Sequence, residues 1–139
     1  MIKKLVYAVV IACLTTTVAL AGSFTWGYCT WGVASVKGTY NKKIGNYELP
    51  WSGNAKDWCT NAKNAGYSTS KTESVRAIVV FPGWSANSYG HVGIVTSAGI
   101  MKSMNDLGGL GNWTSNRAIS TFPNKKSPVK PSCYITYPK

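Results

Sequence analysis

The sequence has few acidic residues and one histidine: four Asp and Glu stand against 15 Lys and Arg in 139 residues. The four carboxylates are too dispersed to suggest a calcium site, since they are Glu48, Asp57, Glu73 and Asp106. His91 and the separated cysteines also lack the ligand spacing of a zinc site. We therefore expect no metal site and no cofactor.

Residues 1–21 have the pattern of a signal peptide. Lys3 and Lys4 precede an uncharged run, and Ala19-Leu20-Ala21 provides the small residues that signal peptidase requires. We therefore expect export, to the periplasm or outside the cell. A membrane anchor is the first alternative, which three consecutive threonines and the Ala-x-Ala site disfavour. A lipid on Cys13 is the second, because Val10-Ile11-Ala12-Cys13 loosely resembles a lipoprotein cleavage box.

The predicted mature chain, residues 22–139, is expected to form one domain. It has no internal repeat, no low-complexity tract and no Pro/Gly-rich linker, and 118 residues can bury a modest core. Its 13 basic and four acidic residues give a net charge of +9, which favours an anionic partner: a cell wall, a membrane surface or nucleic acid. The lysines are scattered, unlike those of a surface that reads nucleic-acid bases. We expect a monomer without stable membrane insertion.

Export also affects how the cysteines are interpreted, because disulfides persist outside the cytoplasm. Removal of Cys13 leaves three cysteines, so one thiol is free or pairs with another chain. If Cys29 is a nucleophile, Cys59 and Cys133 are left to form a bridge. In the chain-entropy model, that bridge contributes about 4 kcal/mol because the loop is long. The sequence leaves the other two pairings open.

Cys29 and His91 are the candidate catalytic pair. The spacing of apolar residues predicts a helix over residues 29–36, directly after Gly27, so Cys29 would lie at a helix N-terminus. His91 precedes a β-branched run. A free thiol is mostly protonated at neutral pH, and both a helix N-terminus and an imidazole favour its thiolate form. The pair predicts a cysteine hydrolase; a structural cysteine and a core histidine are the alternative interpretation.

Local patterns elsewhere indicate an α+β domain. A second helix is expected to begin at Asn54, with Asn54 or Asp57 as its cap, and to end at Gly66. Apolar and β-branched runs predict strands at residues 76–81, 91–96, 100–104 and 133–137, with a hairpin turn at Gly99. Helices followed by strands in this order indicate N-terminal helices packed on an antiparallel sheet.

Five segments together resemble CHAP domains, the cysteine, histidine-dependent amidohydrolases/peptidases of the papain-like superfamily. They occur in the family's order: Gly27-Tyr28-Cys29-Thr30-Trp31, Gly53-Asn54-Ala55-Lys56-Asp57-Trp58, Ala77-Ile78-Val79-Val80, Gly90-His91-Val92-Gly93-Ile94-Val95 and Ser103-Met104-Asn105. The resemblance implies that Cys29 is the nucleophile and His91 the general base. It also implies peptidoglycan as the substrate, cleaved by an N-acetylmuramoyl-L-alanine amidase or an endopeptidase of the stem or cross-bridge.

The chain departs from the family at the group that orients the histidine, where Ser103 replaces a common glutamate. The resemblance implies Asn105 in this role, with Asp106 or a reduced activity as alternatives. For the walls of the cleft we expect Tyr28, Trp51 and Trp84, because these side chains combine a large apolar face with a polar tip.

Two other classes of function compete with the hydrolase. A degenerate hydrolase fold that only binds cell wall is kept open by Ser103 and disfavoured by the presence of both Cys29 and His91. A cationic toxin that acts on membranes would need an amphipathic basic helix, and none is evident in the sequence.

Overall fold

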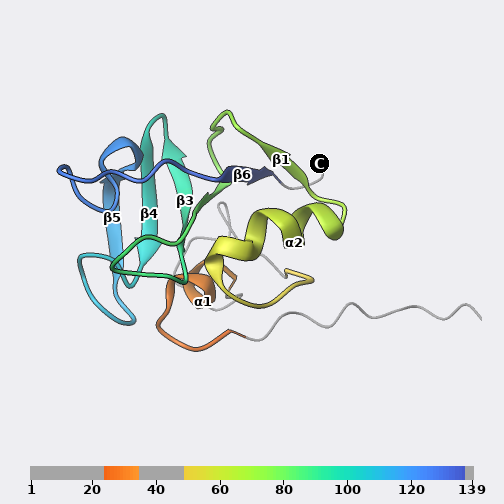
Figure 1. The fold of residues 1–139 in the computed structure, drawn as a ribbon, viewed down its shortest axis with the longest axis horizontal. Coiled ribbons are helices and arrows are strands. Elements are labelled where there is room, and N and C mark those ends of the chain that lie inside the picture. The colour runs from red at the N-terminus through yellow and green to blue at the C-terminus, as the bar shows by residue number, and fades with distance from the viewer. Residues whose placement is uncertain (1–23, 35–48, 137–139) are drawn as a thin grey trace, which may run out of the picture.

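The structure is a computed structural model, and it describes residues 24–34 and 49–136. The predicted signal peptide with Cys13, the end of the first predicted helix and the turn-rich connection up to residue 48 lie outside the described residues. Figure 1 shows one twisted sheet with two short helices beside it.

The sheet has six antiparallel strands in the order β1-β6-β2-β3-β4-β5. Their bounds are Ser68–Ser70, Ile78–Phe81, His91–Ser97, Ile100–Met104, Trp113–Ala118 and Cys133–Thr136 for β1 to β6. The α+β class and the hairpin at Gly99, where φ is 70°, are confirmed. Strands β1 and β5 were not predicted.

The helices precede the sheet in the chain, as expected. Helix α1 spans Cys29–Ala34, and a 3-10 turn, η1 at Ala55–Asp57, leads directly into α2 at Trp58–Asn64. The predicted side-chain caps are wrong, because neither Asn54 nor Asp57 makes a capping hydrogen bond. Instead, the backbone amide of Lys56 donates to the carbonyl of Tyr89 (2.9 Å), which ties the start of η1 to the loop before β3.

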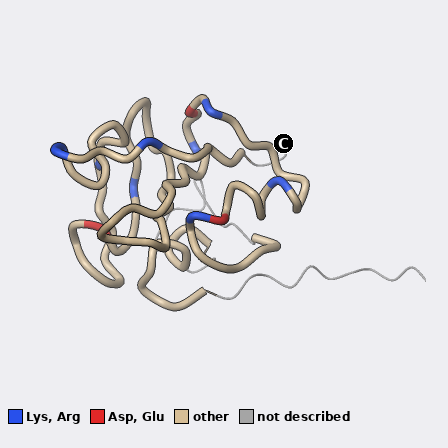
Figure 2. Tube along the Cα trace, viewed as in Figure 1, with Lys and Arg blue, Asp and Glu red and all other residues tan. Residues whose placement is uncertain are grey.

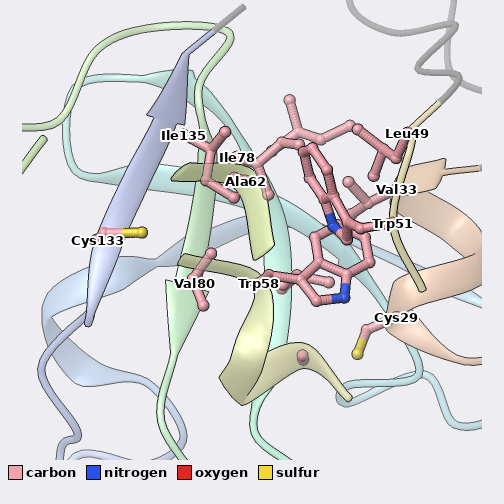
Figure 3. Close-up of a cluster of buried hydrophobic side chains, with 13 residues drawn as sticks. Cys29, Val33, Leu49, Trp51, Trp58, Ala62, Ile78, Val80, Cys133 and Ile135 are labelled. Carbon is pink, nitrogen blue, oxygen red and sulfur yellow. The ribbon is translucent and has the colours of Figure 1, made fainter. Parts of the chain in front are cut away.

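Two hydrophobic clusters lie on opposite faces of the sheet, because successive strand residues alternate in direction. The first packs α1, η1 and α2 against alternate residues of β2, β3 and β6, such as Val80, Val92 and Ile135. Trp58, which is fully buried, lies at its centre (Figure 3). The second packs the other residues of these strands against η2 (Ile119–Thr121) and Phe122.

A disulfide between Cys59 and Cys133 joins α2 to β6. This is the pairing that the sequence analysis favours, and it leaves Cys29 as the free cysteine within the described part of the chain. Lysine and arginine residues are spread over the fold with few acidic residues between them (Figure 2).

Candidate active site

A cleft of about 660 Å³ is lined by residues from four parts of the chain: the start of α1, the start of η1, the loop before β3, and Asn105 after β4. Both Cys29 and His91 belong to its lining. The fold therefore brings together the two residues that the sequence predicts as a catalytic pair, although they are far apart in the chain.

Cys29 is positioned by the close approach of α1 to the sheet. Gly32 faces Met104, and a Cβ atom at Gly32 would come within 2.7 Å of the Met104 Cβ. A larger residue at this helical position would push α1 away from β4. Before the helix, the Gly27 carbonyl accepts a hydrogen bond from the Gly111 amide (2.9 Å). These contacts fix Cys29 beside the start of β3.

Burial controls the acidity of Cys29. The residue is 8% exposed, and desolvation raises the pKa of its thiol from 9.0 to about 11. Backbone amides of Val92, Thr30 and Cys29 itself hydrogen-bond to the sulfur and favour the thiolate, but they do not offset the burial, and the charge of Asp106 opposes them. The backbone amides at the helix start thus favour the thiolate as expected, but burial outweighs them and keeps Cys29 a neutral thiol.

His91 is positioned by a tight junction between two backbones. Gly90 precedes it with φ of 78°, and a Cβ atom there would lie 2.5 Å from the Phe81 carbonyl oxygen. The loop before it is closed by two backbone hydrogen bonds between Trp84 and Asn87 (2.9 Å each). His91 then pairs with Phe81 at the first position of β3.

The imidazole of His91 is also neutral in the folded chain. The residue is 3% exposed, and burial, assisted by the charge of Arg117, lowers its pKa from 6.5 to about 3. A neutral imidazole and a neutral thiol share one cleft, so proton transfer from Cys29 to His91 would accompany attack by the sulfur. The pair has the groups needed for general-base activation of a nucleophile.

The residues considered for orienting His91 have separate surroundings. Ser103 is fully buried, and its hydroxyl donates to Oδ2 of Asp106 (3.3 Å), which also accepts from Nε of Arg117 (2.9 Å). Asn105 lies in the cleft lining, with φ of 54°. The Nε2 atom of His91 is buried and has no hydrogen-bond partner among residues 24–34 and 49–136.

A comparison with protein families matches the model of the CHAP domain to residues 20–106, which include Cys29, His91 and Asn105. This chain belongs to the CHAP domain family. The resemblance found in the sequence is thus confirmed.

Relatives of this CHAP domain include a protein of Streptococcus mutans serotype c (strain ATCC 700610 / UA159) that is named "Putative hydrolase". The two are 36% identical over 73 residues, which are 52% of this chain and 29% of the relative. Among solved structures, the match to "The crystal structure of Ly7917" covers 80% of this chain and 45% of the Ly7917 chain, with 24% identity and a TM-score of 0.40. Ly7917 "with the hydrolyzing product of MDP" matches 61% and 38%, with 24% identity and a TM-score of 0.36. The chain therefore spans less than half the length of these relatives.

The aromatic walls of the CHAP cleft differ from those expected. Tyr28 lines the cleft and is 48% exposed. Trp51 does not line it, because its ring is buried in the first cluster against Trp58 (Figure 3). The Trp51 ring also contacts Tyr67. Trp84 packs edge-on against Phe122 instead, with ring centroids 5.5 Å apart.

Tyr89 is one of the cleft residues that sequence reasoning missed. It is 65% exposed and lines the cleft from the loop before β3, on the chain segment that carries His91. Its position two residues before His91 was the available signal, since residues that flank a catalytic group in a loop commonly contact the substrate.

The described residues of the CHAP domain contain no cluster of three His, Cys, Asp or Glu side chains that could hold a metal ion. Nor does the described part of the chain contain a helix that is long and apolar enough to cross a membrane.

Proposed function

We propose that this CHAP domain is an exported peptidoglycan hydrolase that cleaves an amide bond through Cys29. The observation that carries the proposal is the shared cleft of Cys29 and His91 in a chain of the CHAP family. The bond is that of an N-acetylmuramoyl-L-alanine amidase or of an endopeptidase of the stem or cross-bridge.

In the proposed reaction, His91 accepts the Cys29 proton while the sulfur attacks the amide carbon. The carbonyl oxygen becomes an oxyanion, for which the backbone amide of Cys29 is the proposed donor. The intermediate collapses to a thioester as the amine leaves with the proton from His91. Water, deprotonated by His91, then attacks the thioester and releases a carboxylate and the thiol.

The other cleft residues have proposed roles that follow from where they lie. Asn105 shares the cleft with His91 and is the proposed polar partner of the imidazole during turnover. Tyr28 and Tyr89 are exposed on the segments that carry Cys29 and His91, so we assign them to the walls that contact the sugar-peptide substrate. The excess of basic residues supports attraction to an anionic wall.

Digestion of purified peptidoglycan tests the proposal, with the fragments identified by mass spectrometry. The expected products carry a new carboxylate and a new amine at one type of amide bond, and their identity separates amidase from endopeptidase activity. Cys29→Ala is expected to release no fragments. Release at the wild-type rate by this variant would contradict the proposal.

A wall-binding module without turnover is the second candidate function. It is favoured by the neutral, buried thiol of Cys29 and by the lack of a partner for His91 Nε2 among the described residues. In that case wild type and Cys29→Ala would sediment equally with peptidoglycan, and neither would release fragments.

A further inference from the structure

His91 needs a group that fixes the plane of its ring. A histidine that acts as a base is usually held by a hydrogen bond on the nitrogen that does not face the nucleophile. Within residues 24–34 and 49–136 the buried Nε2 atom of His91 has no hydrogen-bond partner. Ser103, which occupies the position of the family's glutamate, donates a hydrogen bond from its hydroxyl to the carboxylate of Asp106.

An aromatic ring packs against the face of the His91 imidazole. The ring of Phe122 stacks on the imidazole of His91, with centroids 4.8 Å apart and planes 28° apart. Both side chains are buried. Phe122 lies beyond residues 20–106, so this contact is outside the part of the chain that the family model matches.

Phe122 is itself held from several directions. Its ring centroid lies 4.4 Å from that of Phe81, the residue opposite His91 in the β2–β3 register. Trp84 contacts it edge-on, and the guanidinium carbon of Arg117 lies 5.3 Å from its centroid. A ring with three such neighbours has little freedom to turn, so it presents a fixed face to His91.

The backbone beside Phe122 is fixed by the same arginine. Arg117 donates one hydrogen bond to the carboxylate of Asp106 and another to the carbonyl of Pro123. The amide of Val129 donates to the Phe122 carbonyl (2.7 Å). Ser103 thus contributes indirectly, because it holds the carboxylate that holds Arg117.

We propose that Phe122 is a positioning residue for His91, in addition to Asn105, and that the Arg117–Asp106 ion pair secures Phe122 in this role. Stacking fixes the plane of the imidazole while leaving it neutral. Among the described residues, Arg117 on β5 is the charged group that acts on the ring, Cys29 on α1 shares its cleft, and Asp106 after β4 pairs with Arg117. Arg117 disfavours the imidazolium form, so His91 is neutral before the reaction.

Alkylation of Cys29 tests the proposal without a peptidoglycan substrate. Iodoacetamide is added to the purified chain, and the rate is read at the Cys29 peptide by mass mapping, which separates it from Cys13. Phe122→Leu removes the stacked ring and keeps an apolar side chain. At pH 7 we expect it to slow alkylation by about 10- to 100-fold, since a misplaced base assists the thiol poorly.

The pH profile distinguishes a positioning role from a general loosening of the core. The deficit of Phe122→Leu should shrink as pH rises, because hydroxide replaces His91 as the base for the thiol. Tyr134→Leu is the matched control: it removes an aromatic ring from the same buried cluster and leaves the His91–Phe122 pair intact. An equal deficit in Tyr134→Leu, or one that is constant with pH, would overturn the proposal.

The single histidine of the chain allows a direct measurement on the wild type. In an untagged chain, NMR should show contacts between the protons of the His91 and Phe122 rings and one imidazole tautomer. In Phe122→Leu we expect a mixture of tautomers and a His91 pKa closer to 6.5. Absence of the ring contacts in wild type would overturn the proposal even if Phe122→Leu does not fold.

The positioning role rests on the proposed thiol chemistry but can be separated from the proposed substrate. Slow alkylation in Phe122→Leu, with no peptidoglycan cleavage by wild type, would support the role of Phe122 and contradict the proposed function. Cleavage and alkylation at wild-type rates in Phe122→Leu would contradict the role of Phe122 alone.

Discussion

Replacing His91 by Gln should remove a specific part of the acid sensitivity of this CHAP domain. Burial lowers the pKa of His91 from 6.5 to about 3. Between these pH values the unfolded chain binds a proton that the folded chain does not. His91 therefore costs no stability above about pH 6.5, and the free energy of unfolding falls as the pH is lowered below that value. Gln is neutral at every pH, and the variant should lack this contribution.

The magnitude at pH 5 depends mainly on the unfolded state. With an unfolded pKa of 6.5, and a folded pKa well below 5, His91 costs about 2 kcal/mol at pH 5 relative to pH 7. The estimate changes little if the folded pKa is 3 or 4, because His91 is neutral at pH 5 in both cases. It would vanish if the imidazole were solvated and titrated normally.

Urea unfolding followed by tryptophan fluorescence measures this contribution. Wild type and His91→Gln are compared at pH 5 and pH 7 with the disulfide intact, so that the titration of the carboxylates cancels in the difference. We expect wild type to lose about 2 kcal/mol more than the variant between pH 7 and pH 5. If wild type and His91→Gln lost the same stability between pH 7 and pH 5, the burial of a neutral imidazole would be refuted.

The remaining predictions concern the thiol, the disulfide, the polar residues after β4 and the charge. Because the pKa of Cys29 is raised from 9.0 to about 11, the stability of wild type should fall as pH rises between these values. In urea unfolding at pH 10, wild type should have lost about 1 kcal/mol of stability from this source, and Cys29→Ala should not show this loss. Replacing both Cys59 and Cys133 by Ser should lower stability by about 4 kcal/mol, since their loop is long; an unchanged urea midpoint would contradict the bridge. Asn105→Ala should lower peptidoglycan turnover and leave the melting temperature nearly unchanged. Asp106→Ala should lower the melting temperature instead, because it leaves Arg117 without its carboxylate. If Asp106→Ala lost more turnover per folded molecule than Asn105→Ala, Asp106 and not Asn105 would be the partner of His91. Sedimentation with peptidoglycan should weaken as salt rises, whereas salt-independent binding would indicate aromatic contacts.

The fold could be predicted where apolar patterns are strong. The β-branched run before Phe81 and the run after His91 predict β2 and β3, and Gly99 predicts the hairpin to β4. Strand β5 was missed because its residues, Trp113–Ala118, are mostly polar and half-exposed. It forms a strand because it pairs with β4, and the local pattern of apolar residues does not show this pairing.

The sequence predicts the two candidate catalytic residues, and also Tyr28 and Asn105 of the cleft, but not the packing around them. Local motifs identify Cys29 and His91, because glycine turns place each at the start of an element. Burial of Trp51 and stacking of Phe122 on His91 depend on packing between distant segments. The net acidity of Cys29 depends on the same packing, because desolvation by the surrounding chain outweighs the favourable backbone amides.

The central claim is that Cys29 forms a thioester during cleavage of peptidoglycan. The most direct test is to quench wild-type protein in acid during digestion and to map the mass of the Cys29 peptide. The account predicts an added acyl fragment on Cys29 that hydroxylamine removes, and none on the same peptide of Cys29→Ala. Fragment release with an unmodified Cys29, together with full activity of Cys29→Ala, would contradict it.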